Sequence, residues 1–386
     1  MSNETKQGKI KIYKYISILF LIVLIGITLL NVVKKDRKYS ENENRMLTVK
    51  PRFTLSRVIS GRYMKQYEAY KADQFAGRDF WVQLKTKVDK FSGKKEENGV
   101  FQGKDNYLME DIVPAASETV NENLEAMKSF QQTYHSIPMH MLLVPDAANI
   151  LSEKMPAFAV TADQKNQIKQ VKKKLGNGFI WNDAVKPLEK NKEKEIYYHT
   201  DHHWTTKGAY EVFQTMTKSL EIEKNRIVKM KPYAVSDSFN GTLSATSGFE
   251  MKYKEPIYIY LPQEEETEVL VNYVEEQKKT VSMYDSSKLD EKDQYGMFLS
   301  GNHPLVSLKT ISPSGERMLI IKDSYANCFI PFLTPYYREI MVVDPRYYYG
   351  NIHKLMKEHK FDRVLFLYNA NTFFQDNNLS GMLSYE

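Results

Sequence analysis

The segment Ile16–Val33 limits what this chain can fold into more than any other feature, because it is uncharged and nearly all its residues are apolar. A helix of about 18 residues rises about 27 Å, close to the roughly 30 Å hydrocarbon core of a bilayer. The segment runs directly into Lys34-Lys35 and lacks an A-x-A-like cleavage site. We interpret it as an uncleaved signal anchor, and a long cleaved signal peptide is the alternative.

The net charge of the chain is concentrated around this segment. Residues 1–38 hold eight of the 54 basic and two of the 48 acidic residues, which leaves 46 of each sign in the remainder. A body without net charge has no general attraction for phosphate backbones, so we predict no nucleic-acid partner. The short N-terminal tail favours a tail inside the cell and a body outside it, although the basic residues are divided evenly between the two flanks.

Composition narrows the class of this body. Aromatic residues make up 12% of the chain, enough for a sizeable core, which excludes extended disorder. Cys328 is the one cysteine, so disulfide scaffolds, cysteine-rich zinc ribbons and iron–sulfur sites are excluded. Low cysteine use fits an extracytoplasmic bacterial protein. We therefore expect a single-pass bacterial cell-membrane protein with its folded domain outside the cytoplasm.

Three regions follow from the pattern along the chain. Residues 1–38 form the tail and anchor, and residues 39–110 a membrane-proximal stalk with helices. In that stalk the apolar spacing is helical from Gly61 to Phe91 with a break near Gly77, and a hairpin turn is expected at residues 103–106. Residues 111–386 form one further domain, in which the acidic stretch at about 262–294 is interpreted as an insertion.

The last region alternates short apolar segments with helical ones, which predicts an α/β domain built on a parallel sheet flanked by helices. The expected strands are 139–144, 179–181, 196–198, 318–321, 340–343 and 364–368. The expected helices are 117–134, 162–175, 325–333 and 351–360.

Polar clusters follow five of these predicted strands. They are Pro145-Asp146, His199–His203, Lys322–Ser324, Asp344–Arg346 and Asn369–Asn371. In open parallel sheets, ligands bind just beyond the carboxyl ends of the strands. We therefore expect these clusters to form one site.

The densest of them contains Asp201-His202-His203-Trp204. If the segment is extended, Asp201 and His203 lie on the same face. A carboxylate beside an imidazole fixes its tautomer and stabilises the imidazolium, as a general base requires. A chance cluster in a loop is one alternative. A zinc site formed by His199, Asp201 and His203 is another, although the chain has no HExxH or cysteine ligand motif.

Ser324 stands at a predicted strand-to-helix turn, where a serine is most often a helix N-cap. The same turn suits a nucleophile, because the amides of the following helix, beginning at Tyr325, face a developing oxyanion. Together with the Asp/His pair, this predicts a triad of Asp201, His203 and Ser324.

Other polar and aromatic residues have weaker assignments. Asn369 is a candidate oxyanion donor and Asn371 a candidate substrate contact, with turn asparagines as the alternative. Arg346 is a candidate for steering an anionic or polyhydroxyl substrate, with a surface salt bridge as the alternative. Trp204 and Tyr325 are candidates for stacking on sugar rings, with simple packing as the alternative. Cys328 is expected to be a core residue.

The stretch YYHTDHHWTTKGAY strongly resembles the signature of the DHHW family. This family is a branch of the SGNH-type esterases and acetyltransferases and includes the alginate O-acetylation proteins J and X. Supporting stretches occur in the expected order and cover essentially the whole chain after the anchor: ENENRML, DQFAGR, FNGTLSATSG, LSGNHPL, IKDSYAN and VLFLYNAN. The chain has Asp323-Ser324 without the glycine of a Gly-Asp-Ser motif and has no evident carbohydrate-binding domain.

The resemblance implies roles for particular residues. Asp201 would orient His203, His203 would act as base on Ser324, and Asn369 would be the oxyanion asparagine. It further implies an SGNH-like fold, no cofactor and no metal. The implied activity is transfer of acetyl groups to an extracytoplasmic polysaccharide, with the acetyl groups delivered by a multi-pass membrane O-acyltransferase. A carbohydrate acetylesterase with the same triad, or a non-catalytic scaffold of a polysaccharide export complex, are the alternatives.

Overall fold

The computed structural model describes residues 3–40, 45–51, 53–59, 61–249, 251, 254–263 and 268–384. The chain divides into two compact units, Met1–Lys94 and Lys95–Glu386. We describe each unit by itself.

The first unit is mainly helical. Its long helix α1, Asn3–Val33, includes a stretch, Ile12–Val33, that is long and apolar enough to cross a membrane. The remaining elements are β1 Tyr39–Ser40, β2 Arg45–Met46, α2 Leu55–Ile59, α3 Arg62–Asp73 and α4 Arg78–Phe91. The break between α3 and α4 falls where the sequence predicts it: α3 ends at Asp73, and Gly77, with a positive φ of 66°, stands directly before α4.

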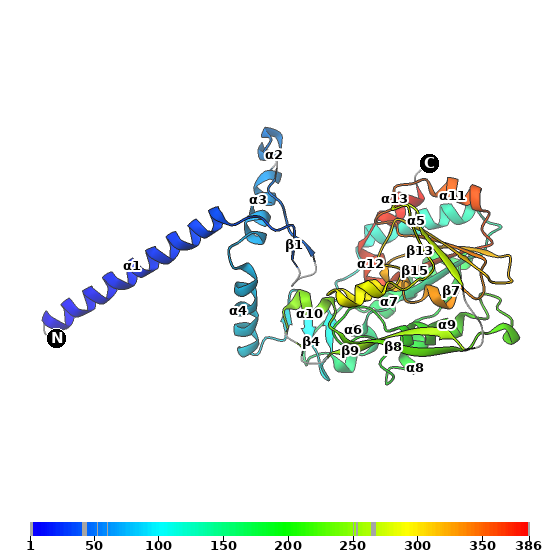
Figure 1. The fold of residues 1–386 in the computed structure, drawn as a ribbon, viewed down its shortest axis with the longest axis horizontal. Coiled ribbons are helices and arrows are strands. Elements are labelled where there is room, and N and C mark those ends of the chain that lie inside the picture. The colour runs from blue at the N-terminus through cyan, green and yellow to red at the C-terminus, as the bar shows by residue number, and fades with distance from the viewer. Residues whose placement is uncertain are drawn as a thin grey trace. The chain divides into compact units, whose positions relative to one another are not determined.

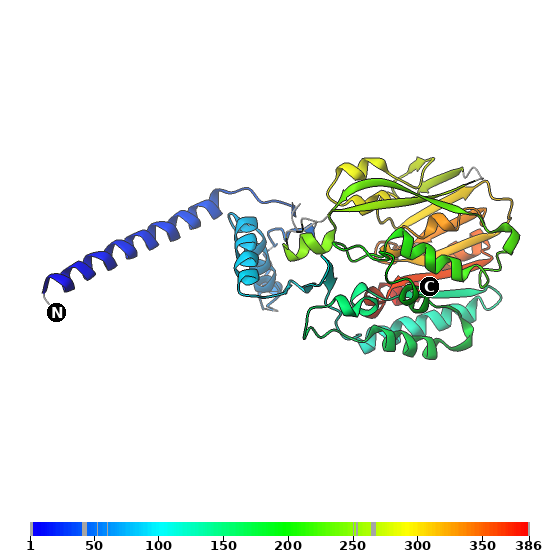
Figure 2. The ribbon, with the colours of Figure 1, turned by 90° about the horizontal axis from the view of Figure 1, so that it is seen from below.

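The second unit is built on an eight-stranded sheet with the order β11-β10-β12-β14-β13-β15-β6-β7. Pairing is parallel from β14 through β13, β15 and β6 to β7, and antiparallel from β14 outward to β11. Figure 2 follows this order, from the yellow edge through orange and red to the teal edge. The strands are β6 Met139–Val144, β7 Ile180–Asn182, β10 Val269–Tyr273, β11 Lys278–Thr280, β12 Leu305–Thr310, β13 Arg317–Lys322, β14 Glu339–Val343 and β15 Arg363–Asn369.

Helices cover both faces of this sheet (Figure 1). One face packs on α5 Ser117–Thr133, α7 Gln164–Leu175, α11 Ile352–His359, α12 Ala370–Gln375 and α13 Asn378–Leu383. The other packs on α6 Ala147–Ile150, α8 Val185–Lys190, α9 Thr206–Met216 and the long hairpin of β8 Met230–Phe239 and β9 Glu255–Pro262. Because both faces are covered, β6 and β15 are buried at every position and are apolar over most of their length. The predicted α/β sheet is therefore confirmed.

Shorter elements complete the second unit. The strands β3 Glu96–Glu97, β4 Val100–Gln102 and β5 Leu108–Glu110 form a small antiparallel sheet, which includes the predicted hairpin. The helix α10, Thr242–Ser247, follows β8. The acidic stretch that the sequence marks as an insertion contains β10 and β11, which extend the main sheet at its antiparallel edge.

Two predicted elements are wrong. Residues 196–198 do not add a strand to the sheet, because Tyr197 makes a single antiparallel bridge to Trp204 across the tight loop between them. Residues 325–333 do not form one α-helix. They form two 3₁₀ turns, Ser324–Ala326 and Ile330–Phe332, and Pro331 in the second has no N–H to continue an α-helical ladder.

Candidate active site

Ser324 is positioned by the residue before it. Asp323 follows β13 and accepts hydrogen bonds from the backbone N–H groups of Tyr325 (3.0 Å) and Asn369 (2.9 Å). The first bond closes the turn that carries Ser324, and the second ties that turn to the end of β15. Burial raises the pKa of Asp323, and the positive charge of Arg346 opposes the rise. The nucleophile candidate thus stands on a turn that is fixed to two central strands.

Glu255 of β9 fixes the start of the loop that carries Asp201 and His203. The carboxylate of Glu255 accepts hydrogen bonds from the backbone N–H groups of His199 and Thr200 and from the Thr200 hydroxyl, at 2.8–2.9 Å. It also contacts His199 Nδ1 at 3.1 Å. The loop ends where the Thr205 side chain caps α9 by accepting from the Gly208 N–H.

A continuous hydrogen-bond chain links the three predicted residues. His203 Nε2 lies 2.8 Å from Ser324 Oγ, and His203 Nδ1 lies 2.6 Å from Asp201 Oδ1. A carboxylate facing Nδ1 requires the proton on that nitrogen, which leaves Nε2 as the acceptor for the Ser324 hydroxyl. This is the tautomer in which an imidazole removes a proton from a serine.

The second oxygen of Asp201 is bound by Thr242, which lies in the stretch FNGTLSATSG. Asp201 Oδ2 accepts from the Thr242 N–H (2.8 Å) and the Thr242 hydroxyl (2.9 Å), both at the start of α10. Gly241 makes this approach possible, because a Cβ there would lie 2.2 Å from the Asp201 Cβ. Burial favours a higher pKa for Asp201, but His202, His203 and these hydrogen bonds hold its pKa well below its usual range. Asp201 is therefore ionised at neutral pH.

The ring of His202 lies beside the chain of three, with its centroid 3.9 Å from that of His203. Its Nδ1 lies 2.8 Å from the Thr242 hydroxyl, which already donates to Asp201 and so accepts here. Burial, followed by the neighbouring charge of His203, lowers the pKa of His202. His202 is thus neutral and is linked to the Asp201 carboxylate through the Thr242 hydroxyl.

Tyr295 is the main site residue that the sequence analysis missed. Its ring stacks on the imidazole of His203, with centroids 3.7 Å apart and planes 11° apart. Its hydroxyl donates to the backbone carbonyl of Ser324 at 3.2 Å. One side chain therefore contacts both the base and the nucleophile. It comes from an aperiodic stretch that carries no recognisable motif.

Asn369 and Tyr325, the two oxyanion candidates, both contact the side chain of Asp146. The amide Nδ2 of Asn369 donates to Asp146 Oδ1 (2.9 Å), and the Tyr325 hydroxyl contacts the same oxygen (3.3 Å) and the carbonyl of His202. The backbone N–H of Tyr325 already donates to Asp323, whereas Asn369 Nδ2 has a second hydrogen. Burial raises the pKa of Asp146, and donors including Asn369 oppose that rise.

The three predicted substrate contacts lie in different surroundings. Trp204 is fully buried: its indole N–H donates to the Tyr325 carbonyl and its ring stacks on Phe329. Arg346 makes two hydrogen bonds to Asp344, at 2.9 and 2.7 Å.

Asn371 lies in the first turn of α12, where its side-chain amide donates to Glu110 of β5 at 3.1 Å. Burial and the negative charge of Asp146 raise the pKa of Glu110 to about 8. Glu110 is thus largely protonated at neutral pH.

Among the residues that the structure describes, Asp201, His202 and His203 offer ligand atoms within 4.8 Å of one another. Both ring nitrogens of His203 already have hydrogen-bond partners, in Asp201 and Ser324. A metal ion on His203 would therefore have to replace one link of the hydrogen-bond chain.

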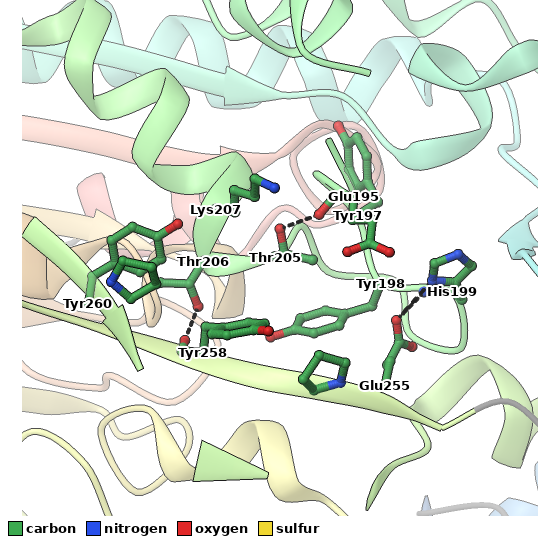
Figure 3. A pocket seen from close by; sticks show the side chains of 12 residues that line it. Glu195, Tyr197, Tyr198, His199, Thr205, Thr206, Lys207, Glu255, Tyr258 and Tyr260 are labelled. Carbon is green, nitrogen blue, oxygen red and sulfur yellow. Dashed lines mark hydrogen bonds and ion pairs between the residues drawn. The ribbon is translucent and has the colours of Figure 1, made fainter. Parts of the chain in front are cut away.

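A cavity of about 250 Å³ is lined by residues 197–199 and 205–207, on both sides of His203 in the sequence (Figure 3). Tyrosine rings form much of its wall, and Glu195 and Lys207 add charge. Its tyrosines are Tyr197, Tyr198, Tyr258 and Tyr260. Tyr198 also makes an edge contact with Tyr295, so the cavity backs directly onto the residues that hold His203.

The fold and the sequence both have relatives. The structure is similar to that of a DHHW family protein from Eubacterium siraeum DSM 15702, with a TM-score of 0.62 and 21% identity over 74% of this chain and 95% of that chain. It is also similar to Bacillus cereus PatB1 bearing a sulfonyl adduct, with a TM-score of 0.60 and 17% identity over 74% of this chain and 97% of that one. At these identities the likeness concerns the fold.

No curated protein is similar enough in sequence to count as a match. A family model described as DHHW protein, however, matches residues 129–343, more than half of the chain. This range includes the Asp201–His203 loop, Tyr295 and Ser324, and it spans the sheet from β6 to β14. The chain belongs to the DHHW family.

Proposed function

We propose that this protein is a membrane-anchored O-acetyltransferase that acetylates an extracytoplasmic polysaccharide through an acetyl-Ser324 intermediate. The observation that carries the proposal is the hydrogen-bond chain from Asp201 through His203 to Ser324, with its donor–acceptor distances of 2.6 and 2.8 Å. α1 supports the anchor, since Ile12–Val33 has the length and composition of a membrane span.

In the first half-reaction, Ser324 Oγ attacks the carbonyl carbon of an acetyl donor while His203 Nε2 takes the hydroxyl proton. Asp201 stabilises the imidazolium that forms, and the free N–H of Asn369 Nδ2 is the proposed donor to the tetrahedral oxyanion. The intermediate collapses to acetyl-Ser324, and the leaving group departs with the proton from His203.

In the second half-reaction, a sugar hydroxyl gives its proton to His203 and attacks the acetyl carbon. The tetrahedral intermediate then releases Ser324, whose Oγ takes the proton back. The products are an acetylated sugar and the free enzyme, and neither step uses a cofactor. Following the family resemblance, we propose a multi-pass membrane O-acyltransferase as the partner that supplies the acetyl groups.

Hydrolysis by the same residues is the second candidate, because Ser324 is only half-buried and water can approach it. Transfer and hydrolysis differ in how well the site excludes water from the acetyl-enzyme. The geometry of the hydrogen-bond chain serves both reactions equally.

The test uses the purified full-length protein with an acetyl ester and a defined oligosaccharide. Mass spectrometry of protein and sugar should find acetyl on Ser324 that passes to the sugar, whereas free acetate alone would indicate the esterase. Ser324→Ala should abolish both, and Ser314→Ala, at a comparably exposed serine, should change neither. Folded protein with no label and no turnover would leave only the scaffold role.

A second reagent probes the nucleophile separately. The fold neighbour PatB1 carries a sulfonyl adduct, and sulfonyl fluorides modify activated hydroxyl groups. We expect phenylmethanesulfonyl fluoride to modify Ser324 in this protein and to lose that reaction in His203→Ala. Modification that persists without His203 would contradict its role as base.

A further inference from the structure

Helix α4 exposes a continuous apolar stripe. Five large apolar side chains on it are between 41% and 95% exposed: Phe80, Trp81, Leu84, Val88 and Phe91. At about 100° of rotation per residue they fall within an arc of about 100° on a helical projection. Soluble surfaces rarely carry so continuous an apolar patch without a partner.

The other side of α4 is packed and polar. Thr86 is buried, and Asp79 forms a paired ion bridge with Arg37, both bonds 3.0 Å long. On the projection, Lys85 and Lys87 border the apolar stripe on its two sides. This is the distribution of a helix that lies in a membrane interface, with its apolar face in the acyl boundary and flanking lysines at the headgroups.

The start of α4 is tied to the end of the apolar helix α1. Asn31, in the last turn of α1, accepts a hydrogen bond from the Ala76 N–H at 2.9 Å. Lys34 donates to the carbonyl of Phe75 at 3.2 Å, and Gln74 exchanges two hydrogen bonds with the backbone of Arg37. The turn before α4 is therefore fixed where α1 ends.

We propose that α4 lies in the outer interface of the same bilayer that α1 spans, with its apolar stripe in contact with lipid. The proposal rests on the anchor proposed above and is independent of the chemistry at Ser324. Figure 1 shows α4 running obliquely to α1 and not continuing its direction, as an in-plane segment requires. Phe80 and Trp81, nearest the tied end, are then the aromatic residues at headgroup depth.

Two observations favour lipid over a protein as the occupant. The stripe begins at a turn that is hydrogen-bonded to the end of a segment with the composition of a membrane span. A lysine also stands at each border of the stripe, where it can contact headgroups; Lys85 lies 2.9 Å from Asp89. A second protein or the other unit of this chain would instead shield the stripe from lipid and water alike.

The experiment places spin labels on single cysteines of the full-length protein in vesicles of phosphatidylethanolamine and phosphatidylglycerol. The native thiol is first removed by Cys328→Ala, since this cysteine is buried. Labels at Leu84→Cys and Val88→Cys report the stripe. Gln83→Cys, exposed and outside the arc on the same helix, is the matched control. Collision with oxygen and with a water-soluble nickel chelate gives the depth of each label.

We expect labels at 84 and 88 to gain oxygen access and lose nickel access relative to the label at 83. Equal nickel access at all three positions would overturn the proposal, and so would labels at 84 and 88 that neither reagent reaches, because protein then covers the stripe. Carbonate extraction of the same vesicles reports the anchor separately. Protein that is extracted indicates failure of the anchor, and protein that resists extraction with water-exposed labels indicates failure of the α4 proposal alone.

Discussion

Asp201 uses both of its carboxylate oxygens, one on His203 and one on Thr242. The first contact fixes which ring nitrogen of His203 carries the proton. The second prevents the carboxylate from rotating away, so the imidazole keeps its orientation toward Ser324. Positioning of this kind costs little at the moment of reaction, because the donors are already in place.

At the same scale, Tyr295 should act as a positioning residue. Tyr295→Leu removes the ring stacked on His203, and we expect kcat to fall by about 2- to 10-fold with KM unchanged, the effect of losing about 0.5–1.5 kcal/mol of aromatic contact. Tyr295→Phe keeps the stack and should lose less. The measurement is kcat and KM of ester turnover for both variants.

The two variants also separate positioning from stability. A lower kcat with KM and the midpoint of thermal unfolding unchanged in the leucine variant would indicate positioning, because the ring contacts the His203 imidazole. Equal losses of kcat in both variants would show that only the hydroxyl bond to Ser324 matters.

At this scale the sequence indicated Asp201, His203 and Ser324, because they stand at strand ends or within a dense polar motif. It did not indicate Tyr295, Thr242, Glu255 or Asp146 in their observed contacts. These residues act through tertiary approaches that no local period encodes. The indole of Trp204 stands beside His203 in the sequence, but the fold places it in the core, on Phe329.

At the scale of elements, the site depends on one close approach between the loop 199–203 and the start of α10. The approach is possible because residue 241 has no side chain, and the loop is fixed on its other side by Glu255 of β9. β9 thus fixes the loop that carries Asp201, and α10 binds the Asp201 carboxylate directly.

Gly241→Ala should therefore damage the site. The added Cβ would lie 2.2 Å from the Asp201 Cβ and 2.6 Å from its Oδ2, so the loop must shift. We expect a loss of about 1–3 kcal/mol in the free energy of unfolding, together with loss of ester turnover. Gly315→Ala is the control, because an added Cβ there meets nothing within 4 Å. Equal behaviour of the two variants in denaturant titrations and turnover would contradict this view of the loop.

The elements themselves were predictable where burial imposes a clear pattern. β6, β13, β14 and β15 are apolar runs bounded by polar residues, and the amphipathic helices between them keep their period. Residues 196–198 have the same apolar character, but they serve a tight loop and not a strand. The helical pattern after Ser324 fails at Pro331, where an apolar run continues without the N–H that an α-helix needs.

At the scale of the whole molecule, the free energy of unfolding should depend on pH through two buried carboxyl groups whose pKa values are shifted in opposite directions. The pKa of Asp201 is held below its usual value, so Asp201 stabilises the fold at pH above about 4 and loses this contribution as pH falls further. The pKa of Glu110 is raised to about 8, so stability is lost as pH rises from about 4 toward 8.

Denaturant titrations across pH should resolve the two groups. Asp201→Asn should lower the free energy of unfolding at pH 7 by about 1–3 kcal/mol and flatten its fall in acid. Glu110→Gln should leave the acid limb unchanged and flatten the decline between pH 4 and 8. Asp290→Asn, an exposed carboxylate, is the control for both. An Asp201→Asn variant with the wild-type acid limb would refute the assignment.

The order of the strands has a consequence for biogenesis. β15 lies in the middle of the sheet, between β13 and β6, but it follows the other seven strands of that sheet along the chain. In a nascent chain, therefore, the β6–β7 pair and the strands from β13 to β11 cannot join into one sheet until β15 has been synthesised. A premature stop codon upstream of β15 should therefore yield a product whose sheet stays divided and which quality-control proteases destroy.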